Sequence, residues 1–152
     1  MKEAAMPDII TFIESDPEAR FTGLPLRVEY IDGIKWLLNR NVTYCTKAGE
    51  IITVRRGFVF DFASVPRSLW WLYPPAGTEG NPYGIAALVH DWLCAHRKIH
   101  GRPITFREAN AIFYEVMVYL GCRRTLAWTM WTAVSSPVGW WLWYKRKPED
   151  VI

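Results

Sequence analysis

Residues 57–67 of this chain read GFVFDFASVPR, and the sequence on either side of them differs in character. Before this run, from residue 26 onward, short β-forming segments alternate with turn residues such as Asp32-Gly33. Asp-Gly supplies the positive φ angles that tight hairpin turns need, so these segments predict an antiparallel meander. After Pro66 the apolar residues recur at helical spacing. The sequence therefore predicts an α+β fold, with an N-terminal antiparallel β meander packed against C-terminal helices.

Two helices are predicted after the loop at residues 74–82. The first runs from residue 83 to about 97 and the second from residue 105 to about 120. Thr105 and Glu108 have the spacing of a capping box, in which each residue bonds to the backbone of the other. Gly121 is the residue type that most often ends a helix. We therefore expect the second helix to begin after Thr105 and to end before Gly121.

The 152-residue chain is 51% apolar, which suffices for one hydrophobic core. We expect an N-terminal segment at residues 1–23, a single α+β domain at 24–121 and a tryptophan-rich helical tail at 122–152. The net charge of +3 is too small to indicate nucleic-acid binding, so no nucleic-acid partner is expected. The three cysteines are widely spaced, which indicates reduced, buried thiols: Cys45, Cys94 and Cys122.

The tail is the compositional outlier, because five of the nine tryptophans lie in it: Trp128, Trp131, Trp140, Trp141 and Trp143. Residues 125–144 carry no charge and are numerous enough to cross a bilayer. However, Pro137 interrupts them, and basic residues flank both ends. We favour two short helices, bent at Ser136-Pro137, whose tryptophans pack across the domain or contact a protein partner. Membrane contact through residues 125–144 is the alternative.

His90 and Asp91 are adjacent on the first predicted helix, and Asp61 lies in the run at residues 57–67. Imidazole and carboxylate groups bind zinc and other transition metals, so these three residues predict a metal site. Asn110 is a weak fourth ligand. In the alternative, structural interpretation, His90 donates to a backbone carbonyl, and Asp91 caps a helix or pairs with an arginine such as Arg67 or Arg97.

Ser64 suggests a second catalytic arrangement, with His90 as the base and Asp61 as the orienting acid. No Gly-x-Ser-x-Gly motif surrounds this serine, and a serine two residues before Pro66 is typical of a turn. We therefore regard Ser64 as a weak candidate nucleophile.

Several motifs, taken in order, resemble the phage and prophage family catalogued as domain of unknown function 1353. The motifs are VRRGFVFDFASVPR at 54–67, WWLYPP at 70–75, ALVHDWL at 87–93, and REAN at 107–110 with Phe113 and Met117. The resemblance covers about residues 24–121 and implies a small protein encoded by tailed phages or prophages. The family pattern has aspartate at the position of Asn110, and an amide in place of a carboxylate weakens a metal site.

Two functions from different classes follow. In the first, the polar residues form a buried cluster, and the protein is a virion- or tail-associated structural or assembly protein. It then acts through its aromatic C-terminal surface on other phage proteins. In the second, Asp61, His90 and Asp91 bind a divalent metal such as zinc, which activates water for hydrolysis of cell wall or a peptide bond. We favour the first, because the tail supplies a surface for a partner and no sequence feature specifies a substrate. We expect synthesis in the host cytoplasm, because the N-terminus lacks a signal-like apolar stretch, and then incorporation into the virion.

Overall fold

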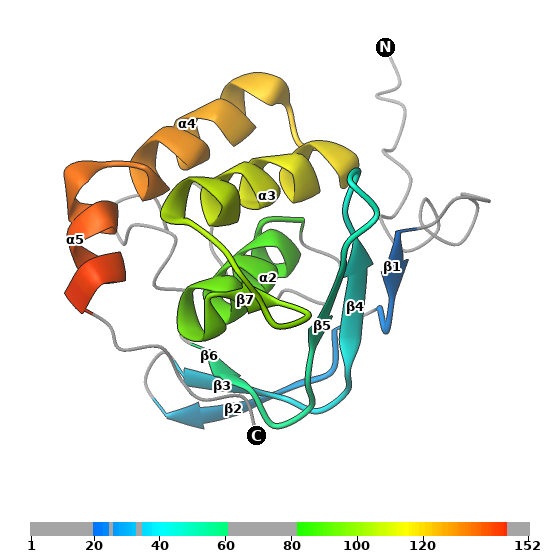
Figure 1. Ribbon diagram of the computed structural model, residues 1–152. Helices are drawn as coiled ribbons and strands as arrows, with labels where there is room; N and C mark the ends of the chain where they lie inside the picture. The colour runs from blue at the N-terminus through cyan, green and yellow to red at the C-terminus, as the bar shows by residue number, and fades with distance from the viewer. Residues whose placement is uncertain (1–19, 25, 33–34, 61–81, 146–152) are drawn as a thin grey trace, which may run out of the picture.

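The computed structural model describes residues 20–24, 26–32, 35–60 and 82–145, and Figure 1 gives the element labels. The strands are β1 (Phe21–Thr22), β2 (Val28–Asp32), β3 (Lys35–Leu38), β4 (Val42–Cys45), β5 (Ile51–Val54) and β6 (Val59–Phe60). Then follow α2 (Pro82–His96), β7 (Lys98–Ile99), β8 (Arg102–Pro103), α3 (Phe106–Tyr119), α4 (Arg124–Val134) and α5 (Pro137–Lys145). Antiparallel strands precede helices, so the predicted α+β class is confirmed.

The strands before residue 61 form two small sheets rather than one continuous meander. One sheet has the order β1-β4-β5 and the other β2-β3-β6, and all pairs are antiparallel. The chain changes sheet between β3 and β4, where side chains at a corner bond to more distant backbone groups. The Arg40 guanidinium donates to the Gly23 carbonyl at 2.9 Å, and the Arg56 N–H donates to Asn41 Oδ1 at 2.7 Å. These contacts hold residues 39–41 as the corner between the sheets.

The β1-β4-β5 sheet presents one face to the core. Alternate side chains are buried along β4 and β5, as expected for a strand with one covered face: Val42, Tyr44, Ile52 and Val54. Tyr44 also reaches α3, where its hydroxyl donates to Glu115 Oε1 at 2.7 Å. The same carboxylate oxygen accepts from the Lys47 backbone N–H at 2.8 Å. Glu115 therefore joins α3 to the β4–β5 turn.

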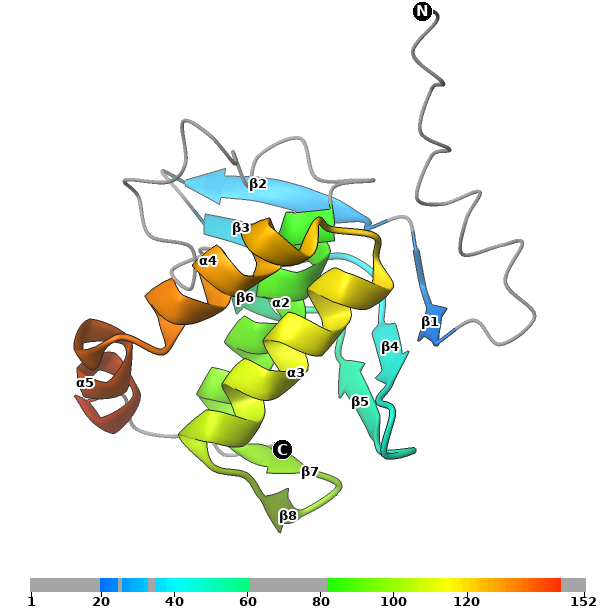
Figure 2. The same cartoon turned by 90° about the horizontal axis from the view of Figure 1, so that it is seen from above.

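Helix α2 is the centre of the molecule. Every residue from Ile85 to Leu93 is at most 9% exposed, and the helix packs against both α3 and β5. Figures 1 and 2 show α2 enclosed between the other helices and the strands. A helix that is apolar around most of its circumference is expected to be buried in this way. Polar side chains on α2 are consequently held inside the protein.

Local sequence signals set both ends of α3, as predicted. Thr105 Oγ1 accepts from the Glu108 N–H at 3.2 Å, and Glu108 Oε2 accepts from the Thr105 N–H at 2.7 Å, which completes the capping box. At the other end Gly121 has a φ of 87°, a conformation that glycine adopts without strain. The N–H of Cys122 donates to the Met117 carbonyl at 3.0 Å, so a carbonyl in the last turn of α3 has a hydrogen-bond partner.

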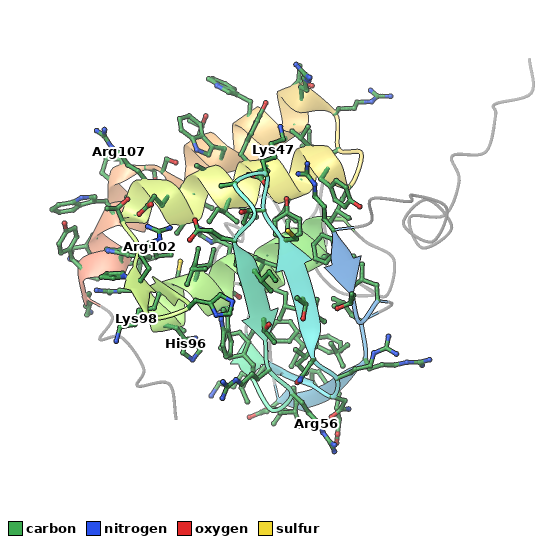
Figure 3. The ribbon with its side chains drawn as sticks, turned by 45° about the vertical axis from the view of Figure 1, so that its right-hand side comes forward. Lys47, Arg56, His96, Lys98, Arg102 and Arg107 are labelled. Atoms are coloured by element: carbon green, nitrogen blue, oxygen red, sulfur yellow. The ribbon has the colours of Figure 1, made fainter. Side chains whose placement is uncertain are left out.

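Arg102, on β8, connects three parts of the fold (Figure 3). Its guanidinium binds both carboxylate oxygens of Glu50, at 2.8 and 3.0 Å. Its Nη1 donates to Glu108 Oε1 at 2.9 Å, so the same residue reaches the capping box of α3. Bidentate pairing of this kind fixes orientation as well as distance. The β7–β8 hairpin is therefore joined both to the start of α3 and to the turn before β5.

The tail folds as α4 and α5, and the predicted bend at Ser136-Pro137 is confirmed because α5 begins at Pro137. Helix α4 packs on α3 and adds three side chains to the common core: Ala127, Met130 and Val134. A Cβ on Gly139 would lie 2.1 Å from the Val134 carbonyl oxygen, so α5 approaches the end of α4 as closely as backbone allows. Helix α5 and strand β1 lie at opposite ends of the molecule (Figures 1 and 2). Within the described residues, no helix has the length and apolar character required to cross a membrane.

Candidate functional site

The predicted polar residues on α2 and α3 meet at a buried contact. His90 is 3% exposed, and its Nε2 lies 2.7 Å from Oδ1 of Asn110, which is 2% exposed. Because an amide oxygen only accepts, Nε2 carries the proton and donates a hydrogen bond to Asn110. The Phe113 ring packs at 4.8 Å from the imidazole, and Cys94 Sγ lies 3.8 Å from each ring nitrogen. The contact joins the two central helices through a side-chain hydrogen bond.

Burial makes His90 a neutral imidazole. Desolvation lowers its pKa from 6.5 to about 4, and the hydrogen bond with Asn110 opposes part of that effect. At neutral pH the ring therefore carries no charge, and its Nε2 proton is already engaged with Asn110. A metal ion at Nε2 would have to displace this hydrogen bond. The structural interpretation expected His90 to bond to a backbone carbonyl, and the contact that the structure gives is with a side chain on the next helix.

Two of the predicted catalytic residues, Asp61 and Ser64, lie outside the described residues, as does Arg67. The metal site and the serine triad therefore stay predictions. Asp91 follows His90 on α2 and is 4% exposed. Within the part of the chain that the structure describes, no group of three or more His, Cys, Asp or Glu side chains is arranged to hold a metal ion.

All three cysteines are free thiols, as predicted, but only Cys122 is buried. Cys45 and Cys94 are half-buried. Burial raises the pKa of the Cys122 thiol to about 12, so this group is protonated at neutral pH. Cys94 lies four residues after His90 on α2, a spacing that predicts a shared helix face, and its sulfur lies beside the imidazole.

Helix α5 carries the second candidate site. Five large side chains on it are between 47% and 66% exposed, and we call them the α5 aromatic surface: Val138, Trp140, Trp141, Leu142 and Tyr144. The rings of Trp140 and Tyr144 pack together at 4.3 Å, and Lys145 Nζ lies 4.5 Å from the centre of the Trp141 ring. Trp128, on α4, is 59% exposed, and Trp131 is half-buried. Most of the predicted interaction tryptophans are thus accessible.

Trp143 differs from its neighbours, because it is 8% exposed and belongs to the core of its own chain. Its ring lies 4.6 Å from the Arg97 guanidinium carbon and 5.8 Å from the Phe106 ring. Arg97 also donates a hydrogen bond to the Trp143 carbonyl. Trp143 was predicted to be an interaction residue, whereas in the structure it anchors α5 on α3 and on Arg97, the residue after α2. A signal existed in the sequence, since Gly139 lies one helical turn before Trp143 and marks the packed face.

The comparisons with known proteins bear on these two sites. The model of a family described as "Protein of unknown function (DUF1353)" matches residues 36–134. The match includes His90, Asn110 and all of α4, and it ends before α5 begins. No curated protein and no solved structure matches the chain. Because the family match covers more than half of the sequence, the protein belongs to the DUF1353 family of unknown function.

Proposed function

We propose that this protein is a non-catalytic binding component of a phage or prophage particle, a structural or assembly protein associated with the virion or its tail. The observation that carries the proposal is the α5 aromatic surface, five large side chains at least 47% exposed on one nine-residue helix. Exposed apolar patches of this kind are typical of interaction sites, and tryptophan and tyrosine are frequent anchors in them. The phage context comes from the resemblance of the sequence motifs.

The buried contact between His90 and Asn110 supports a structural role for these polar residues of α2 and α3. A general base must be reachable by substrate. His90 is 3% exposed, and its Nε2 proton is directed at Asn110. A satisfied buried hydrogen bond of this type fixes how two helices pack. We assign these residues to folding and the α5 aromatic surface to function.

The experiment compares particles produced with three forms of the protein. The first is the wild type, the second is Trp140→Ser/Trp141→Ser, and the third is Tyr30→Ser. Tyr30 is 57% exposed on β2 and serves as a matched exposed aromatic residue outside α5. We expect the wild type and Tyr30→Ser in purified particles by quantitative mass spectrometry, and the double variant reduced at least about tenfold. Equal incorporation of all three, or absence of the wild type from particles, would contradict the proposal.

Elemental analysis separates this function from a metal-dependent hydrolase. The proposal expects no stoichiometric zinc in the purified wild type, and a less stable but still zinc-free His90→Gln variant. Stoichiometric zinc in the wild type, lost in a folded His90→Gln variant, would contradict the structural assignment of His90 and favour the metal-dependent hydrolase.

A further inference from the structure

The geometry of α5 separates one packed face from a broad exposed one. At 100° per residue, Gly139 and Trp143 lie within about 40° of each other around the helix axis. These are the positions that face α4, α2 and α3. The five residues of the α5 aromatic surface and Lys145 spread over the remaining arc of about 200°. Such a helix lies flat on the protein and presents most of its circumference outward.

The one charged residue on α5 is a base, Lys145, at the last position of the helix. In the sequence the uncharged run 125–144 is followed shortly by two acids, Glu149 and Asp150, and is flanked at both ends by bases: Arg123, Arg124, Lys145, Arg146 and Lys147. Arg123, Arg124 and Lys145 belong to the described residues and are exposed. Lys145 lies over the Trp141 ring, which places a cation at the rim of the aromatic side chains. The expected partner is therefore negatively charged and able to accept tryptophan and tyrosine rings.

Two other occupants fit these observations less well. A symmetric contact through α5 would bring Lys145 of each copy toward the other, and α5 carries no acid to pair with it. A span across the bilayer is excluded by length, since α4 has 11 residues and α5 has 9, and crossing needs about 20. Protein interfaces are depleted in lysine, whereas tryptophan, tyrosine and flanking lysine or arginine together are typical of the membrane–water boundary.

We propose that the α5 aromatic surface binds an anionic lipid bilayer, with the helix in the plane of the headgroups and the rings of Trp140, Trp141 and Tyr144 among them. The tryptophan N–H and tyrosine O–H groups stay in the polar layer while the rings enter the acyl boundary. Lys145, at the rim of these rings, attracts the phosphate groups. This inference rests on the proposed function, because it names what the same surface docks onto.

The test is flotation of the full-length protein with vesicles of phosphatidylglycerol and phosphatidylcholine, or of phosphatidylcholine alone. We expect binding to the anionic vesicles that weakens as salt is raised. Each basic side chain near an anionic surface strengthens binding about fivefold, so Lys145→Glu, a change of two charges, lowers the partition coefficient about 25-fold. Trp140→Ser/Trp141→Ser lowers it by more than about tenfold. Both variants replace exposed side chains, so their melting temperatures should match that of the wild type.

Two controls make the outcome specific. Tyr30→Ser removes an exposed aromatic ring from β2, and Arg56→Glu reverses a charge that Figure 3 shows at the end of the molecule away from α5. Both should bind like the wild type. Equal loss with Arg56→Glu and Lys145→Glu overturns the inference, because binding would then follow total charge.

The results also separate this inference from the proposed function. Failure of the wild type to float, while particle incorporation still needs Trp140 and Trp141, overturns the lipid assignment and leaves a protein partner. Self-association in sedimentation velocity that is lost in the double variant, without flotation, assigns the surface to a second copy and likewise overturns it. Flotation that needs the tryptophans, without particle incorporation, supports the lipid assignment and contradicts the placement in the particle.

Discussion

Lowering the pH tests the environment of His90 directly. The buried imidazole has a pKa of about 4, whereas an exposed one has 6.5. Between these values the unfolded chain takes up a proton that the folded chain does not. Folding stability therefore falls as the pH is lowered through this window. Above about pH 6.5, His90 is neutral in both states and contributes no pH dependence to stability.

The size of the effect follows from the two pKa values. Each pKa unit corresponds to about 1.4 kcal/mol, so the full difference between 6.5 and about 4 destabilises the protein by about 3 kcal/mol. About 2 kcal/mol of this is lost by pH 5, where nearly every unfolded molecule carries the extra proton. A typical domain is stable by only about 5–15 kcal/mol, so the loss is readily measured.

The assay is urea unfolding from pH 7.5 to pH 5 for the wild type and His90→Gln. Glutamine keeps an N–H donor for Asn110 but does not titrate. Carboxylates change protonation in both proteins, so the difference between their stabilities isolates His90. Between pH 7.5 and pH 5, we expect the free energy of unfolding of the wild type to fall by about 2 kcal/mol relative to that of His90→Gln. Parallel pH dependence of the two proteins would refute the burial of a neutral imidazole.

Three further predictions concern packing, capping and thiol chemistry. Gly139→Ala places a methyl group 2.1 Å from the Val134 carbonyl oxygen, so thermal unfolding should show a loss of about 1–3 kcal/mol; a gain, as helix propensity alone gives, would contradict the close approach. Thr105→Ala removes the cap of α3 and should cost about 1 kcal/mol in urea unfolding, while Thr105→Ser should retain most of it. Burial raises the pKa of Cys122 to about 12, so iodoacetamide at pH 8 should modify it only in the unfolded protein, as peptide mass spectrometry would show; rapid modification of the native protein would be inconsistent with its burial.

Features fixed by neighbouring residues could be predicted from the sequence. The ends of α3 depend on Thr105, Glu108 and Gly121, whose hydrogen bonds are local, and all three act as expected. The bend at Ser136-Pro137 is local in the same sense, because proline has no N–H for a continuing helix. The division of the strands into two sheets was not predicted, because it depends on contacts such as that between Arg40 and Gly23, 17 residues apart.

The candidate sites show the same limit. The sequence brought His90 and Asn110 into one set as candidate metal ligands, and that prediction stays open because Asp61 lies outside the described residues, but their hydrogen bond to each other was not predicted. Their hydrogen bond depends on the packing of α2 against α3, which periodicity does not determine. Likewise, the composition of the tail indicates an aromatic surface, but the rotation of α5 decides that Trp143 is buried while Trp140 and Trp141 are exposed.

The attachment of Trp143 to Arg97 has a mechanical consequence. Arg97 directly follows α2, donates to the Trp143 carbonyl and lies over its ring. A force that a bound partner exerts on α5 is therefore transmitted to the end of α2, the most deeply buried helix. The force is then distributed over the core, so α5 moves with the rest of the protein as one rigid unit.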